Sequence, residues 1–231
     1  MKHFSCIAIA VVMGTMLWAQ QGRSETTAEQ DYLSNAEDNS IEAIIVRELS
    51  RGDYIAQDDA LTYAEAAIDA GKINNAISRA VQNLATGELF QENRIAGKAS
   101  YIDIQTRACL LLGKIPTAEV RDTLKKIVFW NNEPSVVTAA IRSLCQIGIS
   151  DNENDVVETI RWVEKKFSVL NPVSSLVMTI LASYEKLGPK VSGEQKTLMI
   201  QSISEIAKNT RYVAPVRDRA TKLLADLSGL K

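Results

Sequence analysis

The chain has 231 residues, of which 46% are hydrophobic and 23% are charged, and its formal net charge is −2. This composition is typical of a soluble globular protein that can bury one sizeable core, and its near balance of charge argues against a polyanionic partner such as nucleic acid. With only 11 Gly and 5 Pro, and no long alternation of apolar and polar residues, the chain also does not fit a β-rich fold.

The first nineteen residues are typical of a secretory signal peptide. Lys2 and His3 form a short basic head, and an apolar run follows from Phe4 to Trp18. We expect cleavage after Ala19 and an exported protein, periplasmic or secreted. An uncleaved N-terminal anchor is the alternative, but about 15 apolar residues fall short of the roughly 20 that span a bilayer. No stable membrane span is therefore expected after cleavage.

Residues 20–40 contain many Gln, Ser, Thr and acidic residues, and we predict a flexible acidic lead because such a segment buries little apolar surface. The first helix is expected to begin at Asn39, which forms a capping box with Glu42, and to end before Gly52. Further helices are predicted at 56–70 and 73–85. The segment 89–100 is ambiguous.

A helical pattern then recurs four times: an apolar residue is followed by small or apolar residues four, eight and eleven positions later. The four copies are Ile104-Ala108-Leu112-Ile115, Val136-Ala140-Leu144-Ile147, Leu176-Ile180-Tyr184-Leu187 and Val216-Ala220-Leu224-Leu227. Repeats of this length are typical of stacked antiparallel helix pairs that share one core. We therefore predict an all-α fold, an α-solenoid of about 4–5 repeats over residues 41–231.

Each predicted repeat has an outer and an inner helix. Outer helices are expected at 117–130, 155–170 and 193–209, and inner helices at 102–115, 135–147, 172–187 and 215–227. These bounds agree with local signals. Asp155 and Ser192 have the spacing of a capping box at helix starts, and Gly148 follows the end of an inner helix. The second and third inner helices are apolar almost all round, which predicts a neighbour on each side. Their apolar residues outside the repeated pattern are Val137, Ile141, Val177 and Leu181.

The inner helices resemble those of HEAT-type (armadillo-like) repeats, which commonly read Val-Arg-x-x-Ala-x-x-Ala-Leu-Gly-x-Leu. The segment from Val216 to Leu227 fits closely, and the segment from Ile104 to Ile115 fits except that Gln105 replaces the arginine. The resemblance is clear over 102–231 and loose over 41–100. It implies a right-handed solenoid whose usual role is protein binding, although the wider fold also includes enzymes. Tetratricopeptide repeats are the nearest competitor, but their aromatic signature is absent.

The sequence offers little for catalysis or metal binding. The single histidine, His3, lies in the predicted signal peptide, so we expect no histidine general base or metal ligand after cleavage. Cys109 and Cys145 lack metal-binding spacing and are expected to be two buried free thiols instead of a disulfide. Residues 151–155 begin like a calcium loop, but Val156 replaces the required glycine. Trp130 and Trp162 are predicted to be packing residues. We expect no metal, cofactor or catalytic site.

The predicted function is therefore that of an exported, non-enzymatic scaffold or assembly factor that binds a protein in the periplasm or cell envelope. In a HEAT-like stack the inner helices line the concave face, and the residues opposite their core side could bind this partner. These candidates are Thr106, Leu110, Thr138, Arg142, Met178, Ala182, Asp218 and Lys222. Ordinary packing or solvent exposure also explains these positions. An enzyme or small-ligand carrier that uses carboxylates in the groove, or a structural subunit of an envelope machine, is the alternative.

Overall fold

A computed structural model describes residues 40–87, 98–148, 155–170 and 172–229. The predicted signal peptide, the lead up to residue 39 and most of the 151–155 segment lie outside these ranges. Within them the protein is all-α, with ten α-helices, one short 3₁₀ helix and no strand. The helices are α2 (Ile41–Leu49), α3 (Tyr54–Asp69), α4 (Asn75–Thr86), α5 (Lys98–Leu112), α6 (Ala118–Trp130), α7 (Pro134–Ile147), α8 (Asp155–Leu170), α9 (Ser174–Leu187), η2 (Gly188–Lys190), α10 (Gly193–Lys208) and α11 (Ala214–Ser228).

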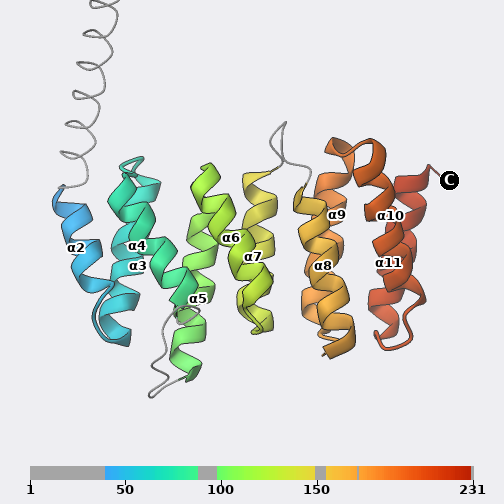
Figure 1. The fold of residues 1–231 in the computed structure, drawn as a ribbon, viewed down its shortest axis with the longest axis horizontal. Coiled ribbons are helices and arrows are strands. Elements are labelled where there is room, and N and C mark those ends of the chain that lie inside the picture. The colour runs from blue at the N-terminus through green and yellow to red at the C-terminus, as the bar shows by residue number, and fades with distance from the viewer. Residues whose placement is uncertain (1–39, 88–97, 149–154, 171, 230–231) are drawn as a thin grey trace, which may run out of the picture.

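The α-helices pack in two rows. Each even-numbered helix from α2 to α10 contacts the next even-numbered helix, and each odd-numbered helix from α3 to α11 contacts the next odd-numbered one. We call these series the even row and the odd row. Each helix of the even row also packs against the following helix of the odd row. Figure 1 shows the result, an elongated arrangement in which the helices follow chain order from α2 at one end to α11 at the other.

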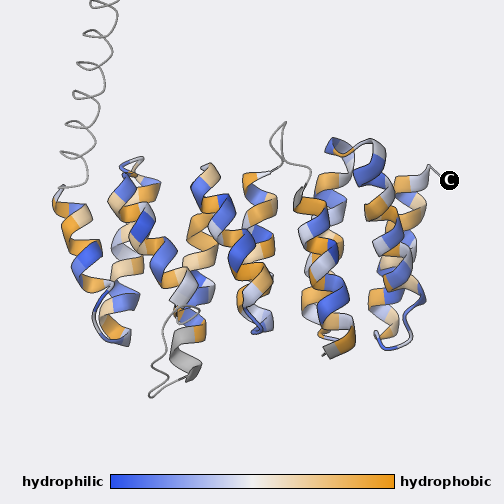
Figure 2. Cartoon of the chain, in the orientation of Figure 1, coloured by the Kyte–Doolittle hydropathy of each residue, from blue (hydrophilic) through white to orange (hydrophobic). Residues whose placement is uncertain are grey.

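The core lies between and within these rows. Apolar and polar positions alternate along the helices (Figure 2), as expected when one side of each helix is buried. The fourfold pattern supplies core residues in every copy, and Ile104, Val136, Leu176 and Val216 are all buried. Val137, Ile141, Val177 and Leu181 are buried as well. The prediction that α7 and α9 each have neighbours on both sides is therefore confirmed.

Two predicted helix caps are wrong. The N-cap of α2 is Ser40 instead of Asn39, because the Ser40 hydroxyl accepts the Ala43 amide at 3.1 Å. Ser192 makes no capping bond to α10. Its expected capping-box partner, Gln195, instead donates to Glu158 of α8 at 3.0 Å. Gln195, which was predicted to cap the start of α10, thus links α8 and α10 of the even row.

Other bounds differ by up to one turn. α5 begins at Lys98 instead of residue 102, since the turn before Ile102 lacks the apolar pattern yet continues the helix. α9 begins at Ser174, and Pro172 precedes it instead of lying in its first turn. α7 begins at Pro134, one residue before the expected start, at a position where a proline costs little because its N–H would have no partner within the helix.

Candidate protein-binding surface

The eight predicted binding residues lie on consecutive helices of the odd row. Leu110, Arg142, Ala182, Asp218 and Lys222 are exposed, whereas Thr106, Thr138 and Met178 are half-buried. The residues occupy equivalent positions on neighbouring helices, so they share one side of this row. We call these eight residues the ridge.

The half-buried members of the ridge are partly engaged in the fold. The Thr138 hydroxyl donates to the Pro134 carbonyl at 2.6 Å. Met178 packs against the core, and the Thr106 hydroxyl oxygen is buried with no partner among the described residues. The side chains free to contact another molecule are therefore the exposed ones, above all Leu110, Arg142 and Ala182.

Arg142 is the only charged residue of α7. It is exposed and forms no ion pair with any other described residue. An arginine at the centre of an exposed face, with five donors and an extended apolar stem, is a side chain that recurs as an anchor in protein interfaces. Arg142 is thus the member of the ridge with the clearest capacity for recognition.

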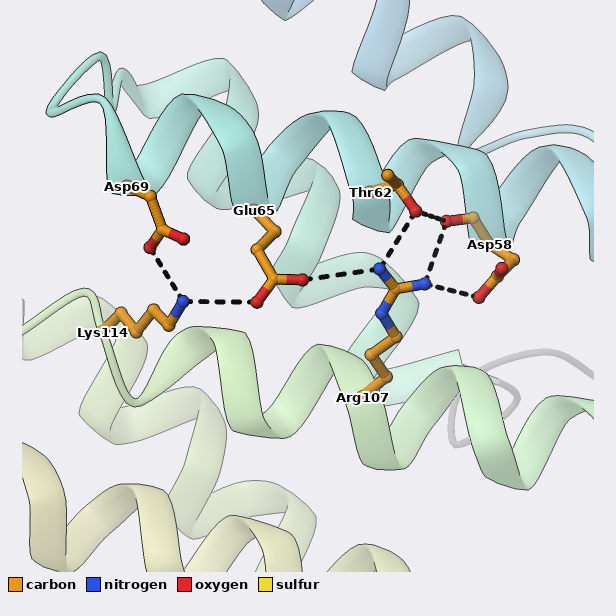
Figure 3. Close-up of polar contacts among 6 residues, drawn as sticks. All are labelled: Asp58, Thr62, Glu65, Asp69, Arg107 and Lys114. Carbon is orange, nitrogen blue, oxygen red and sulfur yellow. Dashed lines mark hydrogen bonds and ion pairs between the residues drawn. The ribbon is translucent and has the colours of Figure 1, made fainter.

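A polar cluster joins the first two helices of the odd row (Figure 3). Its members are Asp58, Thr62, Glu65 and Asp69 of α3, Arg107 of α5, and Lys114 in the turn after α5. The Arg107 guanidinium donates to the Asp58 carboxylate at 2.6 Å, to the Thr62 hydroxyl at 3.0 Å and to the Glu65 carboxylate at 3.5 Å. Arg107 therefore contacts two turns of α3 at once.

Lys114 completes the cluster. Its ammonium group lies 2.8 Å from a carboxylate oxygen of Asp69 and 3.3 Å from one of Glu65. The hydrogen bond to Asp69 is the main reason that the pKa of Lys114 is raised, and the bond to Glu65 adds to it. All three carboxylates of the cluster are thus paired with cations, and they hold α3 against α5 instead of forming a free acid pair.

A second polar link lies at the other end of the odd row. Arg219 of α11 binds Glu185 of α9 at 2.9 Å. Along the odd row, ion pairs therefore link the helices before α7 and the helices after it, whereas Arg142 of α7 forms none with the described residues. Neither link could be predicted from the sequence. Which charged residues face each other depends on which helices lie side by side, and local spacing does not show this.

The two tryptophans of the described region, which were predicted to be packing residues, both lie at the surface. Trp130 is 71% exposed and Trp162 is 40% exposed. Trp162 stacks edge-on against Phe129, with ring centroids 4.8 Å apart. These rings belong to α6 and α8 of the even row, and therefore to the layer that does not contain the ridge.

Glu164 of α8 is a buried carboxylate, only 3% exposed. Burial, and then the neighbouring charge of Glu205, raise its pKa to about 7, while the hydrogen bond from Tyr212 opposes this shift. The Tyr212 hydroxyl donates to Glu164 at 3.3 Å. Because the carboxylate is enclosed, it contributes to packing at the α8–α10 end.

Neither cysteine of the described region is a reactive thiol. Cys109 and Cys145 are free and buried, as predicted, and burial raises the pKa of Cys109 to about 12. In the same ranges no three His, Cys, Asp or Glu side chains gather where they could hold a metal ion. No helix that the structure describes is long and apolar enough to cross a membrane.

No family model, no curated protein and no solved structure matches this chain.

Proposed function

We propose that this chain is an exported α-solenoid of the HEAT type that acts as a protein-binding scaffold, with the ridge as its contact surface. The proposal is supported by the two rows of stacked helices, because a stack of this kind presents one long face to a partner. The signal-like N-terminus supports export into the periplasm or cell envelope.

The observation that favours the ridge is the position of Arg142. It is an unpaired cation on α7, with the exposed Leu110 on one neighbouring helix and Ala182 on the other. Apolar contacts beside a guanidinium are the composition typical of interface centres. A partner that offers a carboxylate between small apolar side chains would match this surface.

Catalysis through groove carboxylates is less well supported. The acids of the odd row that gather most closely are those of α3, and Arg107 and Lys114 bind them. A carboxylate held by a cation is a poor general base. A scaffold therefore agrees better with the described residues than an enzyme or a ligand carrier does.

Site-specific photocrosslinking in native envelopes tests this function. A photoreactive residue at Ala182, beside Arg142, should give an adduct with one defined protein, and the same residue at Gln201 on α10 should not. Gln201 is exposed but lies on the even row. Arg142→Glu should abolish the Ala182 adduct, and Arg142→Ala should weaken partner binding by about tenfold or more.

A matched charge variant controls for general electrostatic effects. Lys196→Glu on α10 changes the charge equally and should leave the Ala182 adduct intact. Adducts that are equal at Ala182 and Gln201, or that persist in Arg142→Glu, would contradict a specific contact at the ridge. Turnover of a small molecule by the purified chain, with no protein adduct, would support the enzyme alternative.

A further inference from the structure

We propose that the even row contains a peripheral docking site for the surface of an anionic lipid bilayer, formed by α6 and α8. We call it the aromatic patch. It consists of Phe129, Trp130, Trp162 and Val169, with Lys126, Lys165, Lys166 and Arg211 around them. This inference is independent of the proposed protein-binding function.

The apolar part of the patch is unusually exposed. Trp130 and Val169 are 71% and 72% exposed, and Phe129 and Trp162 are 37% and 40% exposed. The Phe129–Trp162 ring contact joins α6 to α8. Trp130 follows Phe129 directly at the end of α6, and Val169 lies two helical turns beyond Trp162, on the same face of α8.

Lys166 fixes the geometry of this surface. Its ammonium group donates to the carbonyls of Phe129 and Asn131 at 3.2 and 3.0 Å, at the C-terminal end of α6. The same nitrogen lies 5.0 Å from the centre of the Trp162 ring. A cation at the negative end of α6 and against an aromatic face holds the two helices together. The exposed rings are therefore held in place.

Cations surround the rings. Lys126 lies one turn before Phe129 and Trp130, and Lys165 lies one turn after Trp162. Both are exposed and form no salt bridge with any other described residue, and Lys165 interacts electrostatically with the buried Glu164 beside it. Arg211 donates to the Ser168 carbonyl, which places it beside Val169. Asp122 of α6 forms an ion pair with Lys125, whereas Glu158 of α8 accepts from the neutral amide of Gln195 and keeps its charge. The patch itself contains four cationic side chains and no acid.

The exposure of the apolar side chains favours a bilayer over a peptide as the occupant. Side chains with more than two thirds of their surface in water, such as Trp130 and Val169, project from the protein instead of lining a recess. Projecting rings can enter the headgroup layer, where tryptophan is preferred, while lysines beside them reach anionic headgroups. A short extended peptide has no pocket of its own in which to bury such projecting side chains.

Tryptophan emission provides a direct assay. The protein has three tryptophans, and the chain without residues 1–19, the predicted signal peptide, contains only Trp130 and Trp162. Vesicles of phosphatidylcholine with about one third phosphatidylglycerol should shift the emission to shorter wavelength and co-sediment the protein. Vesicles of phosphatidylcholine alone should do neither, and added salt should release the protein.

Variants localise the contact. Trp130→Ala should lower the partition coefficient about tenfold through lost apolar burial. Lys126→Glu with Lys165→Glu should lower it about 25-fold or more, since each lysine near an anionic surface contributes about fivefold. Ile55→Ala on α3, where the isoleucine is 69% exposed, is the apolar control. Lys186→Glu with Lys190→Glu, at exposed positions outside both the patch and the ridge, is the charge control, and neither control should reduce binding.

Three results would overturn the proposal: no emission shift or co-sedimentation with anionic vesicles, binding unchanged in the patch variants, or equal losses in the control variants. Photocrosslinks from position 130 to an envelope protein, without vesicle binding, would also overturn it and make the patch a protein interface. Because the patch variants leave the ridge unchanged and the Arg142 variants leave the patch unchanged, failure here leaves the proposed scaffold function separately testable.

Discussion

At the residue scale, Glu164 places a titratable group inside the helix packing. Its carboxylate is enclosed by Tyr212 from the loop before α11, by Glu205 of α10 and by residues of its own helix. Burial, followed by the charge of Glu205, moves the pKa from 4.5 to about 7. The folded protein therefore binds a proton that the unfolded chain releases between these two values.

This difference predicts a loss of stability at higher pH. The contribution of Glu164 is fully present below about pH 4.5 and is lost as the pH rises through about 7. Glu164→Gln should remove this loss and, at pH 8, raise the free energy of unfolding by up to about 3 kcal/mol over that of the unchanged protein. Urea unfolding from pH 4.5 to 8 measures it. Glu194→Gln, at an exposed position of α10, should not alter the slope.

At the scale of elements, the polar cluster predicts how strongly α3 is held to α5. Arg107→Ala removes bonds to Asp58, Thr62 and Glu65. Since the cluster is half-exposed, the free energy of unfolding should fall by only about 1–2 kcal/mol, and by less in 1 M salt. Arg51→Ala, which removes an exposed contact with Glu48, should have almost no effect. Equal losses in both variants would show that the cross-helix geometry adds nothing.

The close approach of α5 and α7 leads to a second prediction for these elements. A Cβ atom at Gly113 would lie 2.8 Å from the Ser143 hydroxyl oxygen and 3.1 Å from the Ser143 Cα. Gly113→Ala should therefore lower the free energy of unfolding by about 1–3 kcal/mol. The loss should be smaller in a Ser143→Gly background, which makes room for the added methyl group. Thermal unfolding of the four proteins in this double-mutant cycle provides the measurement.

Most helices could be predicted from the sequence because their signals are local. Thr117, for example, accepts the Val120 amide at 3.2 Å and begins α6 within one residue of the expected start. Errors occurred where two local patterns competed, as with Ser40 and Asn39, or where a capping residue found a distant partner, as Gln195 did with Glu158. Local spacing does not reveal such long-range contacts.

The candidate surfaces could be predicted only in part. Exposure on the odd row follows from helical periodicity, and Arg142 is exposed where it was expected. The position of Trp130 could not be derived in this way, because a large aromatic residue near an apolar face usually packs inside. Its exposure depends on where α6 ends and on how Lys166 of α8 holds that end.

At the scale of the whole molecule, stability should be graded along the stack. α7 contacts helices on both sides and in both rows, whereas α2 contacts only α3 and α4 extensively. Amide hydrogen exchange should therefore be slowest in α7 and faster toward α2, since opening at an end breaks fewer contacts. Exchange measured by mass spectrometry tests this. Identical protection of α2 and α7 would indicate that the described helices unfold as one cooperative unit.

Because both thiols are buried, the stability of the described helices should not depend on redox conditions. Cys109 and Cys145 are free, enclosed by apolar neighbours and kept protonated by desolvation. Reaction with a disulfide or an oxidant requires an accessible thiolate, which neither residue offers. The helices that the structure describes should therefore fold identically in reducing and in oxidising surroundings.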